Sequence, residues 1–230
     1  MSEDQIFKQP KKQAEDFSFN KSVVTVFDDM VTRSVPFYLE IQRMMTELAK
    51  DFAVPGTRVY DLGCSTGTTL NNFDKVLPAD VEFVGMDNSE EMLIKCDQNF
   101  KNAGFKRKYT LINHDLNTGI KIENASVVVL CLTLQFVRPL YRDRLVQEIF
   151  NQMNDNSCLI LIEKVLGEDS LFNRLFIKYY YDFKRRNNYD DIEIAQKREA
   201  LENVLIPYKL MENREMLLNK GFKYVETFFK

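Results

Sequence analysis

A glycine-bracketed turn is the first stretch of this sequence that suggests chemistry. Residues 61–67 read DLGCSTG, after RVY and before TTLNNF, which predicts a strand, a tight turn and a helix. Glycine lets a backbone turn sharply and approach a ligand closely. A dinucleotide fingerprint, G-x-G-x-x-G, needs a central glycine beside the pyrophosphate, and Ser65 occupies that position here. We therefore expect a ligand without phosphates, such as S-adenosylmethionine (SAM), rather than NAD; a turn without any ligand is the alternative.

Acidic residues end the next two expected strands. Asp87 ends the second strand, where a carboxylate can accept hydrogen bonds from both hydroxyls of a ribose. Asn88 follows it and is a candidate adenine contact. Asp115 ends the third strand, where an adenine amino group would be within reach. Each of these residues has an alternative role as a helix N-cap or turn residue.

A charged residue on an expected apolar helix face is the second notable feature. In EIAQKREALENVL, an apolar stripe at helical spacing is formed by Ile194, Leu201 and Leu205. Arg198 falls inside this stripe, where a guanidinium is unfavourable unless it meets an anion such as a carboxylate. A snorkelling side chain or a structural ion pair is the alternative. Lys197 lies at the margin of the stripe and is the weaker candidate.

Two other residues have ambiguous roles. His114 is the only histidine, but strand alternation would point it away from Asp115, so a general-base role is disfavoured. Tyr38 is expected either above the glycine turn or in the core of an amphipathic helix. With one histidine and no metal-ligand spacing, the sequence predicts no metal site.

Composition bounds the class of protein. The chain has 230 residues, 45% of them hydrophobic and 28% charged, which is typical of one globular domain. Its longest apolar runs are far shorter than the roughly 20 residues that cross a bilayer, and its polar N-terminus does not resemble a signal peptide. Four separated cysteines fit a reducing compartment, so we expect a cytoplasmic protein. A net charge of −3 favours a small-molecule substrate over broad nucleic-acid binding.

Strand-like and helix-like segments alternate through the middle of the chain. Strands are expected near 57–62, 81–87, 108–114, 125–132 and 158–165, with helices near 66–76, 89–102 and 139–154. This alternation predicts a Rossmann-like, doubly wound α/β sheet. The single domain would comprise N-terminal helices (18–52), a nucleotide-binding core (57–165), a helical insertion after the fifth strand (166–206), and a last helix and strand (207–230), the strand being KYVETFFK.

The sequence resembles class I SAM-dependent methyltransferases and, more specifically, the bacterial carboxy-SAM synthases. The resemblance runs from about Phe17 to the chain end. It rests on VFDDMVTRSVPFY, YDLGCSTG, MDNSEEM, ENASVVVLCLTLQF, FKRRNNYDDIEIAQKREALENVL and GF. The first and fifth of these blocks are specific, because ordinary methyltransferases carry neither.

The resemblance implies a reaction. Carboxy-SAM synthases convert SAM and prephenate into carboxy-SAM and phenylpyruvate: prephenate supplies carbon dioxide and a base, and the deprotonated SAM methyl group captures the carbon dioxide. Such chemistry asks for positioning and water exclusion more than for side-chain acids or bases. A conventional SAM methyltransferase acting on tRNA or a small molecule, and a SAM-binding module without turnover, are the rival hypotheses.

The resemblance also implies site residues and partners. The family's SAM contacts match Tyr38, Gly63, Cys64, Ser65, Asp87, Asn88 and Asp115, and Cys131 stands where the family has asparagine. Arg198 matches the arginine that holds the added carboxylate. The resemblance implies a homodimer, with the 166–206 insertion as an interface or active-site lid. The product serves an enzyme that modifies the wobble uridine of tRNA, and direct tRNA binding by this acidic chain is not expected.

Overall fold

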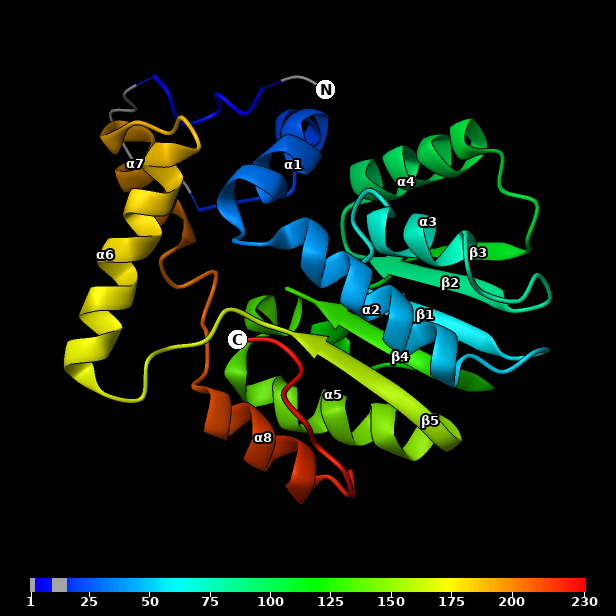
Figure 1. Cartoon of the computed structure of the whole chain (residues 1–230). Coiled ribbons are helices and arrows are strands. Elements are labelled where there is room, and N and C mark those ends of the chain that lie inside the picture. The colour runs from blue at the N-terminus through cyan, green and yellow to red at the C-terminus, as the bar shows by residue number, and fades with distance from the viewer. Residues whose placement is uncertain (1–2, 10–15) are drawn as a thin grey trace.

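A five-stranded sheet is the centre of the molecule (Figure 1). The computed structural model describes residues 3–9 and 16–230. The strand order is β3-β2-β1-β4-β5, and every neighbouring pair is parallel. The strands are β1 (Arg58–Leu62), β2 (Glu82–Asp87), β3 (Tyr109–Asn113), β4 (Ala125–Cys131) and β5 (Met153–Ile162). This order and direction confirm the predicted doubly wound sheet.

Helices cover both faces of the sheet (Figure 1). One face carries α2 (Tyr38–Phe52), α3 (Thr68–Asp74) and α4 (Glu90–Ala103). The other carries α5 (Pro139–Gln152) and α8 (Leu210–Asn219). Strand β4 is buried from Ala125 to Leu130 because helices cover it from both sides, which explains its continuous apolar sequence.

The two faces hold separate apolar cores. Met45, Phe73 and Phe100 belong to the core under α2, α3 and α4. Leu130 and Leu145 belong to the core under α5 and α8. All five side chains are fully buried, and each contributes about 1.5–3 kcal/mol of hydrophobic stabilisation. These cores hold the strands rigidly, so that the loops at the strand ends have a fixed support.

Three helices lie beyond the sheet, on the side of the strands' carboxyl ends (Figure 1). They are α1 (Lys21–Ser34), α6 (Ser170–Arg186) and α7 (Asp191–Leu201). Their starts are well specified: Asn20 and Asp169 cap α1 and α6, and Asp190 forms a capping box at α7. Short 3₁₀ turns, η1 (Leu116–Thr118) and η2 (Leu134–Phe136), complete this side. The expected helical character of 18–52 and 166–206 is present.

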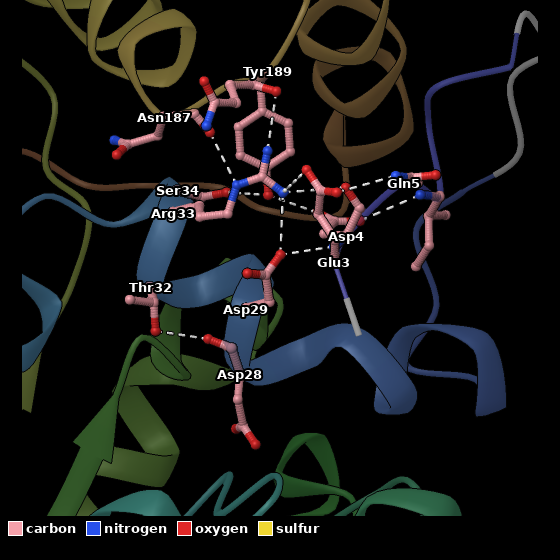
Figure 2. Close-up of polar contacts among 12 residues, drawn as sticks. Glu3, Asp4, Gln5, Asp28, Asp29, Thr32, Arg33, Ser34, Asn187 and Tyr189 are labelled. Atoms are coloured by element: carbon pink, nitrogen blue, oxygen red, sulfur yellow. Dashed lines mark hydrogen bonds and ion pairs between the residues drawn. The ribbon is translucent and has the colours of Figure 1, made fainter. Parts of the chain in front are cut away.

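Arg33 ties three distant segments together on this side of the molecule (Figure 2). Its guanidinium donates to Asp29 in α1, to the Asp4 carbonyl, and to the Asn187 carbonyl between α6 and α7. It also stacks over the Tyr189 ring, with 4.2 Å between Cζ and the ring centroid. The N-terminal segment, α1 and the α6–α7 turn are therefore joined around one partly buried cation.

Two predicted boundaries differ from the structure. Strand β5 begins at Met153, directly after α5, rather than near residue 158. The sixth strand expected over KYVETFFK is wrong, since residues 222–230 adopt no strand conformation. This segment is anchored by side chains instead: Phe228 packs against the core under α2, and Phe229 against Phe37. Its aromatic composition reflects these contacts and not a hydrogen-bonded ladder. Through the described residues, no helix combines the length and hydropathy needed to span a membrane.

Candidate functional site

The glycine turn leaves β1 at the carboxyl edge of the sheet. Gly63 and Gly67 have φ angles of +85° and +83°, in the left-handed region that glycine tolerates best. A Cβ on Gly63 would collide with the Thr133 side chain, and one on Gly67 would lie 2.6 Å from Cys96 Sγ. The backbone N–H groups of Gly63 and Cys64 both donate to the Met86 carbonyl. The turn is therefore pressed against β2, β4 and α4.

Asp87 is joined directly to this turn. Its Oδ2 accepts from the Ser65 backbone N–H at 3.0 Å, and its Oδ1 accepts from the Ser89 N–H at 2.9 Å. Burial raises the pKa of this carboxyl, against the opposing effect of the backbone donors. The side chain is 9% exposed and lines the same cavity as the turn. A buried carboxylate with spare lone pairs is well suited to accept ribose hydroxyls.

A single cavity of about 230 Å³ collects the predicted cofactor residues. Those lining it are Tyr38, Gly63, Cys64, Ser65, Asp87, Asn88, Asp115 and Cys131. They come from the ends of β1, β2, β3 and β4 and from the start of α2, which is where ligands bind in open α/β sheets. Among the predicted site residues, only Arg198 is outside the lining.

Residues after β3 have double roles. Asp115 caps η1, accepting from the Asn117 backbone N–H at 2.9 Å, and also lines the cavity. His114 lines the cavity too, and its Nε2 lies 2.7 Å from the Gly119 carbonyl oxygen. Because a carbonyl only accepts, this contact requires a proton on Nε2. His114 is thus held by the backbone, and the expectation that it is no general base stays a prediction.

Tyr38 and Cys131 are linked through a residue that the sequence analysis did not identify. Gln42, on the buried side of α2, donates to the Tyr38 hydroxyl at 3.2 Å and to Thr69 Oγ1 at 3.2 Å. Its amide nitrogen also lies 3.9 Å from Cys131 Sγ. Gln42 is 1% exposed. The sequence signal for Gln42 is a polar residue on the apolar face of an amphipathic helix, next to Ile41.

A strained turn follows β4 and lines the cavity. Leu132 adopts φ +58°, which is unfavourable for a non-glycine residue, and it lines the cavity. Glu163, at the end of β5, accepts from the Leu134 and Gln135 backbone N–H groups at 2.9 and 2.8 Å. Burial raises the pKa of Glu163 to about 8, although these donors oppose the shift. Glu163 holds the turn in its strained shape.

Helix α1 and several aromatic side chains also line the cavity. Asp28 accepts a hydrogen bond from the Thr66 hydroxyl at 2.6 Å, so α1 is fastened to the glycine turn. Phe17, Phe19, Phe27 and Phe136 also line the cavity. The sequence analysis missed these aromatics, because an aromatic in a ligand wall and one in a core have the same pattern. They give the cavity an apolar side that excludes water.

The positions of Lys197 and Arg198 differ from expectation. Lys197 is 6% exposed and lines the cavity, whereas Arg198 is exposed. Arg198 borders a separate shallow hollow with Tyr181, Arg185 and Asp191. The buried side of α7 is centred on Ile194, Lys197 and Ala200. The placement of Arg198 on the buried stripe is therefore incorrect in this chain taken by itself.

In residues 3–9 and 16–230, no group of three or more His, Cys, Asp or Glu side chains is arranged to hold a metal ion. The free cysteines Cys64 and Cys96 are buried, Cys131 and Cys158 partly so. Burial raises the pKa of the Cys131 thiol, so at neutral pH it is a weak hydrogen-bonding group and no thiolate.

Solved structures share this fold. An O-methyltransferase family 2 protein from Planctomyces limnophilus superposes with a TM-score of 0.63 at 16% identity, covering 91% of this chain and 58% of that one. A SAM-dependent methyltransferase from Aquifex aeolicus gives a TM-score of 0.59 at 16% identity, covering 91% and 92%. A family model described as a methyltransferase domain matches residues 59–156. The fold is thus that of class I SAM-dependent methyltransferases.

Sequence relatives identify the family within that fold. The carboxy-S-adenosyl-L-methionine synthase of Methylococcus capsulatus is 59% identical over 231 aligned positions, covering 100% of this chain and 96% of the relative. The enzyme of the same name from Nitratiruptor sp. is 40% identical, covering 100% and 94%. The match is full-length and includes the α6–α7 insertion as well as the sheet. The chain belongs to the carboxy-S-adenosyl-L-methionine synthase family.

Proposed function

We propose that this protein forms carboxy-SAM from SAM and prephenate, releasing phenylpyruvate. The full-length 59% identity to a carboxy-SAM synthase is the observation that carries the proposal. In atom balance, prephenate loses carbon dioxide and hydroxide to give phenylpyruvate. Hydroxide removes a proton from the SAM methyl group, and the carbon dioxide is added there. The protein then needs to bind, orient and shield the two substrates more than to act as an acid or base.

The cavity fits the SAM part of this reaction. We assign the adenosine to the edge formed by the glycine turn, Asp87 and Asn88, with Asp115 near the adenine. Asp87 is held by two backbone donors and is thus already oriented for ribose hydroxyls. Cys131 contributes shape and not a strong hydrogen bond, because a protonated thiol is a weak donor and acceptor.

The apolar wall fits the carboxylation. Phe19 and Phe136 make an edge-to-face pair with ring centroids 5.4 Å apart, and both line the cavity. Excluding water protects the deprotonated methyl group from simply regaining a proton, and it strengthens the electrostatic interactions inside the site. The phenylpyruvate ring formed from prephenate is itself apolar and suits this wall.

Arg198 is proposed to hold the added carboxylate from a second copy of the chain. Its side chain is exposed and outside the cavity of its own chain, so contact with that chain's product would require α7 to move. The neighbouring α6 exposes apolar side chains, with Phe172 and Phe176 exposed by 55% and 51%. Such a face is typical of an interface. A homodimer through the 166–206 insertion would cover it and bring Arg198 towards the partner's cavity.

The product is proposed to serve an enzyme that modifies the wobble uridine of tRNA. The chain itself carries a net charge of −3, which does not favour phosphate-backbone binding. Direct binding to tRNA is therefore not part of the proposal, and the small-molecule product would be handed on.

One experiment separates this function from its rivals. Purified protein is incubated with SAM, with and without prephenate, and the small molecules are identified by mass spectrometry. Carboxy-SAM and phenylpyruvate formed in equal amounts, only with prephenate, support the proposal. A protein that binds SAM and leaves it unchanged would instead be a binding module. Prephenate-independent formation of S-adenosylhomocysteine with an acceptor would make it a conventional methyltransferase.

A further inference from the structure

One end of the cavity is positively charged. Lys197 lines this end, and its ammonium donates to Ser34 Oγ at 3.2 Å. Among the described residues, its ion-pair partner is Asp4, with 3.7 Å between Lys197 Nζ and Asp4 Oδ2. Ser34 and Tyr180 line the cavity beside it. Lys197 comes from α7, whereas the glycine turn and Asp87 lie at the ends of β1 and β2, and no hydrogen bond or ion pair that engages the lysine involves the groups assigned to adenosine.

Two more lysines flank Tyr180. Lys184, one helical turn further along α6, is 5% exposed. Within the part of the chain that the structure describes, no hydrogen bond or ion pair engages its ammonium, which lies 4.7 Å from the Tyr180 ring centroid. The Lys164 ammonium lies 5.4 Å from the same centroid. Two ammonium groups therefore lie near a ring that forms part of the cavity wall, while the Lys197 ammonium lies 5.5 Å from the Tyr189 ring centroid.

The acids nearby have other partners. Asp4 Oδ2 accepts from the Tyr189 hydroxyl at 2.7 Å, and Asp29 accepts from Arg33 at 3.1 Å (Figure 2). The nearby carboxylates are thus already bound to other groups, while Lys184 has no carboxylate partner among the described residues. A buried ammonium without a counter-ion is costly, and such groups mark places where an anion binds.

The acidity of the lysines agrees with this geometry. Burial, and then the neighbouring Lys197 and Lys164, lower the pKa of Lys184 to about 7. Burial lowers the pKa of Lys197 to about 8, although Asp4 opposes the shift. The charged groups that face the two lysines are Lys164, Asp4, Arg33 and Glu193. A carboxylate entering the cavity would favour the charged forms and raise both pKa values.

We propose that Lys197, with Lys184 and Lys164 around Tyr180, forms an anion site that binds a carboxylate of the second substrate. This inference rests on the proposed function and extends it, because prephenate is a dicarboxylate and its contacts are otherwise unassigned. Lys197 makes the direct contact. Lys184 and Lys164 add positive potential from behind the Tyr180 ring, and this end of the cavity thereby selects a small organic dianion over a neutral acceptor.

The first test compares three substitutions of the same type. Lys197→Met and Lys184→Met remove a charge at nearly constant volume, and Lys121→Met removes a side chain that is 84% exposed and remote from the cavity. We expect the KM for prephenate to rise about ten- to hundredfold in Lys197→Met, and less in Lys184→Met. The Kd for SAM should stay within about twofold of the wild-type value in both variants, and Lys121→Met should change neither constant.

The result that would overturn the proposal is specific. If both lysine variants bind SAM normally and keep the wild-type KM for prephenate, the anion site is wrong, while carboxy-SAM formation by the wild-type protein still supports the proposed function. If wild-type protein forms no carboxy-SAM, the proposed function itself fails.

A second measurement needs no variant. Prephenate is titrated into wild-type protein saturated with S-adenosylhomocysteine, which has no methyl group to react, in triethanolamine and Tris buffers at pH 8, neither of which is an anion. Binding at the lysines predicts net proton uptake, seen as a binding enthalpy that depends on the ionisation enthalpy of the buffer. An enthalpy equal in both buffers would contradict the site.

Discussion

Lys197 and Arg198 are adjacent in α7 but face different environments. The Lys197 side chain lines the ligand cavity, and the Arg198 side chain is exposed beside Arg185 and Asp191. Consecutive helical residues are about 100° apart around the axis, so one residue can serve its own chain while the next serves a neighbour. In the proposed dimer, the same short segment would place a cation on each of two substrates.

Arg198→Leu tests the role of the exposed residue. We expect the affinity for carboxy-SAM to fall about 10- to 100-fold, since a charged hydrogen-bonded pair contributes about 1.5–3 kcal/mol. The affinity for SAM, which lacks the extra carboxylate, should hardly change. Isothermal titration with both ligands gives the comparison. Equal losses for the two ligands would contradict the assignment.

Asp87→Asn tests the cofactor edge. The amide replaces an acceptor oxygen with a donor, so it weakens either the Ser65 N–H contact or the ribose contact. We expect the Kd for SAM to rise roughly tenfold or more. Asp97→Asn, on the exposed side of α4, is the matched control and should bind SAM normally. Wild-type affinity in Asp87→Asn would exclude the carboxylate from the site.

Phe176→Glu tests the interface on α6. A buried glutamate at an apolar interface is unfavourable, so we expect a dimer to become a monomer in size-exclusion chromatography with light scattering. Turnover should fall with it if Arg198 acts across the interface. Ile94→Glu changes a similarly exposed residue on α4, 53% exposed, and should leave the oligomeric state intact. A wild-type monomer, or a variant that remains dimeric, would place the interface elsewhere or remove it.

Lys184→Met tests the cost of the buried ammonium. The pKa of Lys184 is near 7 in the fold and 10.5 in the unfolded chain, so between these values the unfolded state binds more protons and stability rises with pH. At pH 7 and below the burial penalty is complete. We expect the ligand-free variant to gain roughly 3–10 °C in Tm at pH 7 and much less at pH 10. Lys121→Met is the control, and a pH-independent effect would argue against a buried charge.

Much of the fold was predictable because it depends on local patterns. The fully apolar run of β4 fits few structures other than a parallel strand covered on both faces. The positive φ of Gly63 is a conformation that glycine adopts most easily, so the residue type indicates the turn. The position of the cofactor residues follows from the strand and the turn, because the end of a strand determines where Asp87 lies. Such features are set by sequence period and backbone sterics.

The other end of the cavity was not predictable from pattern. On α7 the positions 194, 197, 198 and 201 all fit one helical face, and only tertiary packing against α1 and α6 centres that face on Lys197 rather than Arg198. Lys184 lies in a basic run, KRR, that is typical of a solvated surface. Its burial arises from contacts with residues distant in the sequence, which periodicity does not record. The strand predicted over KYVETFFK was wrong for the same reason.

The Arg33 cluster connects the N-terminal segment around Asp4 to the proposed anion site. Asp4 forms an ion pair with Lys197, and Arg33, Asp29 and Tyr189 hold Asp4 in place. Cutting the chain at residue 9 would leave the sheet and the glycine turn untouched, yet it would remove one negative charge from beside the anion site. For recombinant work, affinity tags therefore belong at the C-terminus, and a trimmed N-terminus would yield a protein that binds SAM but handles its second substrate with altered charge.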